Sequence, residues 1–307
     1  MNGFINVLKP PGMTSHDVVS WLRQTLKIKR IGHGGTLDPD VAGVLVIAIG
    51  QATRLLEYLL TNPKSYRCEI LLGMVTDSQD LSGKILEKRH VPNDYRLRFT
   101  KVTKDFIGAI SQVPPMISAV HHNGRRLYEL AREGLVVERE PRTVNIYSLE
   151  IVDWGEKSET PRILFDVSCS KGTYIRTLCH DIGEAIGCGA TMSYLLRTAS
   201  FPFTIDNAWT LEEISSALND GRYDFILPYD YALQGMPVVT VRDEAVLKVL
   251  NGVGVDERDV VEIAGPINDG KPLCIYNRKG ILLAIGIGRQ QEGLSKIKLC
   301  KVFKNEG

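Results

Sequence analysis

The feature that most constrains the fold is a glycine-rich stretch, residues 32–43, in which four glycines surround the carboxylate of Asp38. Glycine loses more backbone entropy on folding than any other residue, so such a cluster predicts sharp bends or close approach of a ligand to the backbone. Pro39 fixes its own φ angle and biases Asp38 toward an extended conformation. The sequence therefore predicts an exposed carboxylate that is held in one place.

Three other kinds of structure share features with this stretch. An Asp-Pro pair is also typical of a helix N-cap and its first residue, and for the pair alone that interpretation is favoured. However, residues 44–49 are rich in β-branched side chains and end at Gly50, which predicts a buried strand and leaves little room for a helix. A phosphate loop would need a Gly-Lys-Ser/Thr ending, and an esterase oxyanion loop would need a Gly-x-Ser-x-Gly elbow. The sequence has neither partner motif.

Composition narrows the class of protein. A chain of 307 residues with 44% hydrophobic and 24% charged residues is ordinary for a globular protein with one large domain and a smaller companion, or two domains. Its six cysteines show no C-x-x-C spacing and its six histidines no H-E-x-x-H pattern, so we expect no metal site, and cysteines that serve as small buried hydrophobes. No signal peptide or membrane-spanning run is recognised, so the cytoplasm is expected.

Local charge is more informative than the net charge of +1. Residues 23–30 carry four cations and no acid, and they lead directly into the glycine-rich stretch. A second group of lysines lies near the C-terminus, at Lys296, Lys298, Lys301 and Lys304. A charge run is usually a solvated face, but one beside a candidate active site favours phosphate contacts.

The periodicity of apolar residues predicts alternating strands and helices. The expected strands are 4–8, 44–49, 66–72, 144–152 and 162–167, and the expected helices begin near Ser15, Gln51, Thr173 and Thr210. Thr173 as the cap of a helix running to about Ile186 places Arg176 in the first turn. A cation there opposes the helix dipole, so we expect Arg176 to face an external anion.

Two regions differ from the rest of the chain. Residues 114–142 have few large apolar side chains and resemble an excursion from the core, either a solvated hairpin or a mobile grip on a ligand. Residues 238–307 predict one helix followed by hairpin-like strands, and therefore a small, mostly β module. The expected domains are 1–235 and 238–307.

Several motifs occur together in a specific order. They are Lys9–Ser15, the glycine-rich stretch, Tyr66, the turn at 76–83, Ser170–Thr177 and Gly187–Ala190. In this order and spacing the chain resembles the bacterial tRNA pseudouridine synthases of the TruB family over nearly its whole length, which is far more specific than any single motif. Departures at Gly34, Ile117, His121 and Leu196 concern loop geometry or RNA contacts rather than catalytic groups.

The resemblance implies an α+β fold. Its catalytic domain would be built on a mixed, largely antiparallel sheet flanked by helices, with a thumb-like insertion at 114–142 and a PUA-like RNA-binding domain at 238–307. It also implies isomerisation of uridine 55 in the TΨC loop of tRNA, by base flipping and without a cofactor. The expected partner is the T-arm of tRNA, with no membrane and no protein partner, and the chain is expected to be a monomer. The alternatives are a tRNA-folding chaperone and a synthase that depends on a guide RNA.

By the same resemblance, Asp38 is the catalytic carboxylate, and Arg176 pairs with it and lowers its pKa. Tyr66 stacks on the flipped uracil and is a candidate base. His33 meets the RNA loop and assists flipping. The remaining residues that would bind or support the substrate are Asp80, Tyr174, Leu195 and Arg197. A carboxylate suits this chemistry because breaking a glycosidic bond develops positive charge on the sugar.

Overall fold

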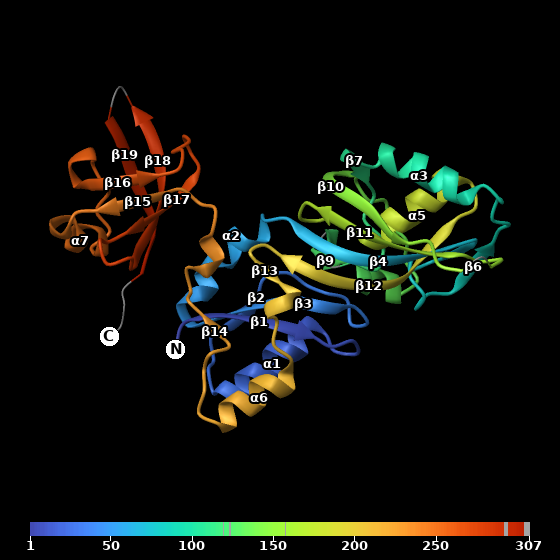
Figure 1. Cartoon of the computed structure of the whole chain (residues 1–307), viewed down its shortest axis with the longest axis horizontal. Coiled ribbons are helices and arrows are strands. Elements are labelled where there is room, and N and C mark those ends of the chain that lie inside the picture. Colours follow the sequence, from blue (N-terminus) through green and yellow to red (C-terminus); the bar gives the residue numbers. More distant parts are fainter. Residues whose placement is uncertain (119, 123, 157, 292–293, 304–307) are drawn as a thin grey trace.

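A ten-stranded sheet dominates the computed structural model, which describes residues 1–118, 120–122, 124–156, 158–291 and 294–303 (Figure 1). In sequence order its strands are β1 (Gly3–Lys9), β2 (Ile31–His33), β3 (Ala42–Ile49), β4 (Lys64–Leu72), β7 (Gly108–Gln112), β10 (Arg142–Asp153), β11 (Arg162–Cys169), β12 (Ala190–Ser200), β13 (Phe203–Thr204) and β14 (Ile226–Leu227). The spatial order is β14-β1-β3-β12-β4-β11-β10-β7, with β2 paired to β3 and β13 to β12. Within the described residues, β3 and β12 are parallel and the other pairs of this sheet are antiparallel, which confirms the predicted mixed sheet.

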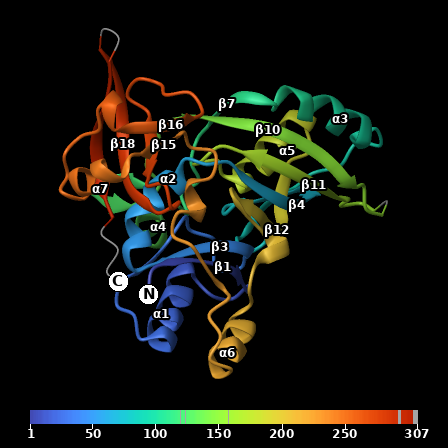
Figure 2. The same ribbon diagram turned by 60° about the vertical axis from the view of Figure 1, so that its left-hand side comes forward.

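Helices cover this sheet and enclose the main core. They are α1 (Ser15–Leu26), α3 (Tyr95–Asp105), α5 (Ile175–Ile186) and α6 (Leu211–Asn219). In Figures 1 and 2, α1 and α6 lie beside β1 and β3, whereas α3 and α5 lie over the half formed by β4, β10 and β11. Alternate residues of the strands, such as Ile47 of β3 and Cys68 of β4, join the helices in one apolar cluster. The two halves of the sheet therefore share a core.

The C-terminal part of the chain forms a second sheet with its own core. Its strands are β15 (Val238–Val241), β16 (Val260–Ala264), β17 (Pro272–Tyr276), β18 (Leu282–Gln291) and β19 (Leu294–Val302), in the order β16-β15-β17-β18-β19, with α7 (Asp243–Leu250) packed on it. A further apolar cluster joins this sheet to the first one, because Leu282 and Phe303 pack with Phe4 of β1 and with Leu59 of α2 (Leu56–Leu60). The C-terminal sheet is thus docked on the larger part of the chain (Figure 1).

Several local expectations need correction. Helix α1 is capped by Thr14, which forms a capping box with Asp17, so the predicted cap at Ser15 is wrong. The predicted helix from Gln51 begins as a 3-10 helix, Gly50–Leu55, and becomes α-helical only at Leu56, because Ile49 supplies no capping side chain. Of the six cysteines, Cys300 is exposed rather than buried.

Other short elements of the described residues include two hairpins and one α-helix. They are β5 (Met74–Thr76) with β6 (Ile85–Lys88), β8 (His121–His122) with β9 (Arg125–Arg126), and α4 (Leu127–Arg132). In the described ranges, no helix is long and apolar enough to cross a membrane.

Candidate active site

Asp38 lies in the loop between β2 and β3, and this loop is anchored on both sides of the carboxylate. Leu37 and Val41 are each 4% exposed. The Leu37 amide donates to the Ser15 hydroxyl at 2.9 Å. The ammonium of Lys9, which is fully buried at the end of β1, donates to the Pro39 carbonyl at 2.9 Å. The strand β1 and the start of α1 therefore fix the backbone around Asp38.

Burial costs the charged form of Lys9 its hydration and lowers the pKa of this lysine to about 8. Its ammonium also donates to the carbonyls of Pro10 and Met13, so the buried donors are satisfied. Sequence reasoning recognised the motif that contains Lys9 but gave this lysine no part in the site. The signal that could have found it is the following Pro10-Pro11-Gly12 turn, which bends the chain so that carbonyls face back toward Lys9.

Glycine is required at two positions near Arg197 of β12: at Gly43 in β3, where a Cβ would clash with Arg197, and at Gly35 in the loop, where the φ angle is positive. Gly43 has φ +119°, and a Cβ there would lie 2.3 Å from the Arg197 carbonyl oxygen. Gly35 has φ +120°, and its carbonyl accepts from the Arg197 guanidinium at 3.2 Å. The same guanidinium donates to the Val44 carbonyl at 2.7 Å. Arg197 is only 1% exposed, and its expected contact with substrate stays a prediction.

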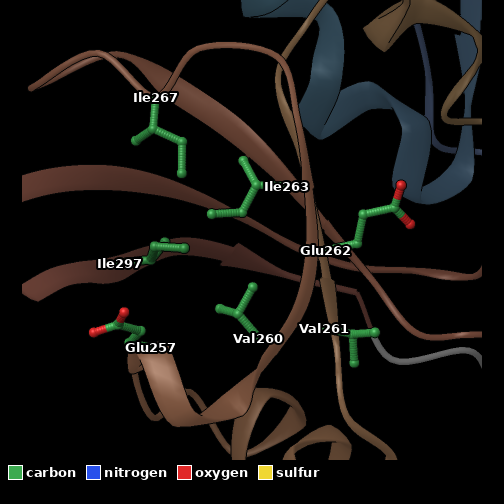
Figure 3. Close-up of a pocket in the computed structure, with 7 residues that line it drawn as sticks. All are labelled: Glu257, Val260, Val261, Glu262, Ile263, Ile267 and Ile297. Carbon is green, nitrogen blue, oxygen red and sulfur yellow. The ribbon is translucent and has the colours of Figure 1, made fainter.

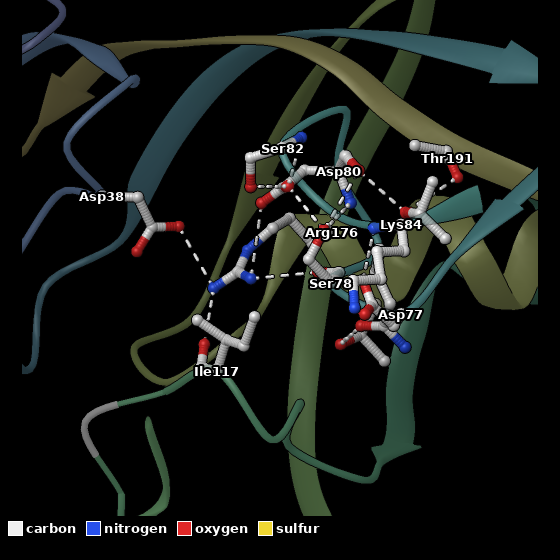
Figure 4. A network of polar contacts seen from close by, with 12 residues as sticks. Asp38, Asp77, Ser78, Asp80, Ser82, Lys84, Ile117, Arg176 and Thr191 are labelled. Carbon is white, nitrogen blue, oxygen red and sulfur yellow. Dashed lines mark hydrogen bonds and ion pairs between the residues drawn. The ribbon is translucent and has the colours of Figure 1, made fainter. Parts of the chain in front are cut away.

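Arg176 lies in the first turn of α5, as the sequence predicts, and it connects two carboxylates (Figure 4). Its guanidinium is 3.2 Å from Asp38 Oδ2 and 3.5 Å from Asp80 Oδ2. It also donates to the Ser78 carbonyl at 3.1 Å and to the Ile117 carbonyl at 2.9 Å. The side chain is 5% exposed, so these four partners replace nearly all of its water. The predicted cap at Thr173 is wrong, however, because the N-cap is Tyr174 and the Thr173 hydroxyl donates to Ser170.

The turn after β5 presents Asp80 to Arg176. Asp80 Oδ1 accepts from the hydroxyls of Ser78 at 2.7 Å and of Ser82 at 2.5 Å, which leaves Oδ2 for the arginine. Gln79, which lies between Ser78 and Asp80 in the chain, adopts a left-handed conformation with φ 65°. The Thr177 hydroxyl of α5 donates to the side-chain oxygen of Gln79 at 2.7 Å. Sequence reasoning missed Gln79 and Thr177, since a turn and a helix 98 residues apart leave no joint pattern.

The charge state of Asp38 follows from competing effects. Burial raises the pKa of its carboxyl, the Arg176 cation opposes this, and the Asp80 carboxylate adds to the rise. Arg176 lowers the Asp38 pKa, as expected, but burial outweighs it and the net direction is upward. The side chain is still 48% exposed, which limits the desolvation cost. The Arg176 cation therefore favours the ionised form of Asp38, and burial opposes it.

Tyr66 of β4 faces Arg197 across the sheet, because the two residues are paired in the β4–β12 register. The residue is 9% exposed. Burial raises the pKa of the phenol, which therefore keeps its proton at neutral pH. The Asp38 carboxylate also acts on this hydroxyl, so both groups belong to one site.

The other predicted residues lie around this centre. Leu195 is opposite Cys68 in the same register and so shares the face of Tyr66. The Tyr174 amide donates to the side-chain oxygen of Gln112, and the Gln112 side-chain nitrogen donates to the Tyr174 carbonyl. His33 of β2 is partly buried, and burial followed by the Arg197 cation lowers its pKa, so the imidazole is neutral near pH 7. Its Nδ1 has no hydrogen-bond partner in the described part of the chain.

The excursion at 114–142 borders this site. It contains the β8–β9 hairpin and α4, and its backbone touches the centre where the Ile117 carbonyl accepts from Arg176. Several of its apolar side chains are exposed, among them Ile117, Leu135 and Val136. Exposed apolar side chains beside a polar site are available to a ligand.

Apart from this site, the C-terminal sheet contains a cavity (Figure 3). It measures about 400 Å³, and its lining is aliphatic with two acids: Glu257, Val260, Val261, Glu262, Ile263, Ile267 and Ile297. Without a cation it does not suit a phosphate. Among the described residues, no group of three or more His, Cys, Asp or Glu side chains is placed to hold a metal ion.

Comparison with known families and proteins covers nearly the whole chain. Residues 23–175 match the model of the N-terminal domain of TruB family pseudouridylate synthases, and residues 176–234 match that of the tRNA pseudouridylate synthase B C-terminal domain. The tRNA pseudouridine synthase B of Moorella thermoacetica is 48% identical over 98% of this chain and 99% of its own length. The enzyme of the same name from Alkaliphilus oremlandii is 46% identical over 99% of each chain.

Solved structures also resemble this chain. A chain of a Cbf5-Nop10-Gar1 complex is 33% identical, with a TM-score of 0.76, over 98% of this chain and 85% of that one. A chain of an H/ACA RNP bound to a substrate RNA containing 2′-deoxyuridine is 31% identical, with a TM-score of 0.75 and the same coverage.

Proposed function

This chain belongs to the TruB family of tRNA pseudouridine synthases, and we propose that it converts uridine 55 in the TΨC loop of tRNA to pseudouridine with Asp38 as the catalytic carboxylate. The family membership confirms the resemblance found in the sequence. The observation that carries the assignment of Asp38 is its place 3.2 Å from Arg176, beside Tyr66, in a loop whose backbone is anchored on both sides.

The reaction exchanges one bond of the uracil for another. The bond from ribose C1′ to uracil N1 breaks, and its electron pair leaves with the base, so positive charge develops at C1′. The Asp38 carboxylate stabilises that charge, either as an ion pair or through a covalent bond. The rotated uracil then bonds to C1′ through C5, the C5 proton leaves to water, and N1 gains a proton. Nothing is oxidised or reduced.

The uridine must leave the base stack to reach Asp38. We assign Tyr66 as its stacking partner, with Leu195 and Tyr174 beside it, because an aromatic face contributes roughly 1–3 kcal/mol per stacked base. Asp80 supports Arg176 from the opposite side. His33 would contact the RNA loop and assist flipping, and the excursion at 114–142 would act as a thumb that grips the T-arm. That the chain acts as a monomer in the cytoplasm stays a prediction.

The activity should decline on acidification at a higher pH than an ordinary aspartate would dictate. Because burial raises the Asp38 pKa, the carboxylate is fully ionised only above that raised value and is lost as the pH falls through it. Single-turnover rates from pH 4 to pH 8, with tRNA affinity measured at each pH, check this. A rate that stays constant down to the pKa of an unperturbed aspartate contradicts it.

The C-terminal sheet should contribute to tRNA affinity through lysines on one exposed face of β19. Lys296 and Lys298 are exposed there. Lys301 instead donates to the Arg54 carbonyl and the Glu57 carboxylate of the larger domain, so it is not proposed as an RNA contact. Lys304 lies outside the described residues.

Replacing Lys296 and Lys298 together with glutamine should reduce the slope of log affinity against log salt by about 2, or about 1 per phosphate contact. The matched control replaces Lys271 and Lys279, which are exposed turn residues of the same sheet. An unchanged slope in the first variant would remove these lysines from the interface.

The proposed function is tested with tRNA transcript labelled with tritium at uridine C5 and with the purified chain alone. One tritium per tRNA should be released, and none from a transcript with cytidine at position 55. Release at several uridines, or from the cytidine 55 transcript, would contradict the assigned position.

A guide-RNA-dependent synthase is the second candidate. The observation that favours it is the similarity to chains of three solved complexes, with TM-scores of 0.74 to 0.76. They are an H/ACA RNP, a Cbf5-Nop10-Gar1 complex and an archaeal box H/ACA sRNP Nop10-Cbf5 complex. The identity of 46–48% to the bacterial enzymes over 98–99% of the chain favours a protein that needs no partner. A requirement for added proteins before any tritium is released would reverse this choice.

A further inference from the structure

The C-terminal sheet has an edge strand, β16, whose outer side is unpaired. This strand is the first in the order β16-β15-β17-β18-β19, and within that sheet it pairs only with β15. Among the described residues, no main-chain hydrogen bond outside the β15 pairing involves residues 261–264. An edge strand presents a row of main-chain donors and acceptors on its outer side, and another extended chain can pair with them. β16 therefore offers these groups to a further strand.

β16 carries little of the protection that is usual at an edge. Lysine, proline and bulges commonly keep edge strands from pairing with other chains. The sequence Val-Val-Glu-Ile-Ala contains neither lysine nor proline. A shift in register makes Val261 the extra residue of a bulge, so the regular part of the strand is Glu262–Ala264. Val261 and Ile263 are 43% and 50% exposed. Large apolar side chains on an unpaired edge indicate a binding surface.

The two faces of β16 present different side chains. Ile263 is paired with Val239, which is fully buried, so Ile263 lies on the core side of the sheet. Glu262 is paired with Thr240 and lies on the opposite face. The side chains of a strand added beside β16 would alternate in the same way. Successive residues of that strand would therefore meet two different environments.

On the core side, the edge of β16 borders the cavity of about 400 Å³ that Figure 3 shows. Ile263 of β16, Ile267 of the following loop and Ile297 of β19 point toward a common space. Glu257 stands at the margin of this space. An aliphatic side chain of an added strand would fill the cavity and remove these apolar surfaces from water. The core-side positions of the added strand should therefore be valine, isoleucine or leucine.

The opposite face of β16 is open as well. A hollow of about 510 Å³ lies over β16, β15 and β17, with Glu262 and Arg278 as its charged residues. Arg278 follows β17, two strands away from the free edge. Glu262 is exposed and, in the described part of the chain, forms no ion pair, unlike Asp256 and Asp259, which are paired with a lysine. The position beside Glu262 on an added strand should therefore be a cation.

The same charges disfavour two other occupants of this edge. Pairing of β16 with β16 of a second copy would bring the two Glu262 carboxylates to one face of a shared sheet, where like charges repel. An RNA backbone would meet Glu257 and Glu262, which repel phosphates. An extended protein segment with cations satisfies both the main-chain groups and the acids.

We propose that β16 is a docking strand for an extended segment of a partner protein, in which aliphatic residues alternate with lysine or arginine. The segment adds to the sheet beside β16, with its aliphatic side chains in the cavity of Figure 3 and its cations beside Glu262. This docking strand belongs to the C-terminal sheet, so the proposal goes beyond the function proposed above and does not depend on it.

The test uses a synthetic peptide, acetyl-Gly-Lys-Ile-Lys-Val-Lys-Gly-amide, and the isotope-labelled full chain observed by NMR. We expect saturable shifts of the amide resonances of residues 261–264. A peptide of the same composition with its three lysines in succession should bind about tenfold more weakly, because it lacks the alternation. Glu262→Lys should weaken binding by about tenfold or more. Glu244→Lys, at an exposed acid of α7, is the matched control and should change the affinity by less than about twofold.

Two further peptides test whether the contact is a strand pairing. They carry N-methyl groups on alternate amides, one set on the odd positions and the other on the even positions. Every second amide of an added strand faces β16, so one of the two peptides should bind and the other should not. Binding by both, or by neither, would overturn the proposal.

Three other results would also overturn it. The first is the absence of saturable shifts with the unmethylated peptide, or shifts that lie away from β16. The second is displacement of the peptide by tRNA, which would assign this edge to the RNA interface. The third is self-association of the free chain that Glu262→Lys abolishes, which would assign the edge to a second copy.

Discussion

Replacing Asp38 with asparagine should reduce single-turnover tritium release by on the order of a thousandfold or more while leaving tRNA affinity within about twofold. The amide has nearly the shape of the carboxylate, so the anchored loop is preserved. It cannot carry the negative charge that opposes the positive charge at C1′. The loss should therefore appear in the rate of the chemical step rather than in binding.

Asp40→Asn is the matched control, because Asp40 is an exposed carboxylate in the same loop. It should retain the wild-type rate. Equal rates for Asp38→Asn and wild type would remove Asp38 from the mechanism. Growth rescued equally well by Asp38→Asn would favour a tRNA-folding chaperone.

Replacing Arg176 with methionine should have the second largest effect, on both rate and stability. The change leaves Asp38 and Asp80 facing each other without the cation, and it leaves the carbonyls of Ser78 and Ile117 without their donor. We expect a rate reduced by about a hundredfold or more, since Asp38 loses its orientation and gains a proton more easily. We also expect a loss of about 2 kcal/mol in the free energy of unfolding, below the range for a fully buried pair because Asp38 is half exposed.

Two measurements check this account of Arg176. The acid limb of the rate profile should move to higher pH in Arg176→Met, because the cation holds the Asp38 pKa down against burial. Arg162→Met is the control for stability, since Arg162 forms a more exposed pair with Glu69 and should change the free energy of unfolding by less than about 1 kcal/mol. If the rate of Arg176→Met declined on acidification at the same pH as that of the wild type, the pairing of Arg176 with Asp38 would be contradicted.

Elements with a strong local signal could be predicted from the sequence. The strands β1, β3 and β4 follow from apolar runs that end at turn residues. Arg176 lies in the first turn of α5 as predicted, although the cap is one residue later than expected. The cap of α6 was also predictable, because Thr210 and Glu213 have the spacing of a capping box. Such features depend on neighbours within a few residues.

The residues that hold the site together could not be predicted in the same way. Ser15 bonds Leu37, Thr177 bonds Gln79, and Arg197 bonds Gly35, each across a long separation in the chain. A neutral hydroxyl or carbonyl leaves no pattern in the sequence for such contacts. The lowering effect of Arg176 on the Asp38 pKa was predictable, but the larger opposing effect of burial was not, because only the folded chain determines burial.

The most direct test of the central claim locates pseudouridine in the product. Unmodified tRNA transcript is incubated with the purified chain alone, treated with a carbodiimide that marks pseudouridine, and examined by primer extension. The account predicts one stop, at position 55, with the wild-type chain and none with Asp38→Asn. No stop with wild type while tRNA remains bound, or the same stop with Asp38→Asn, would contradict it.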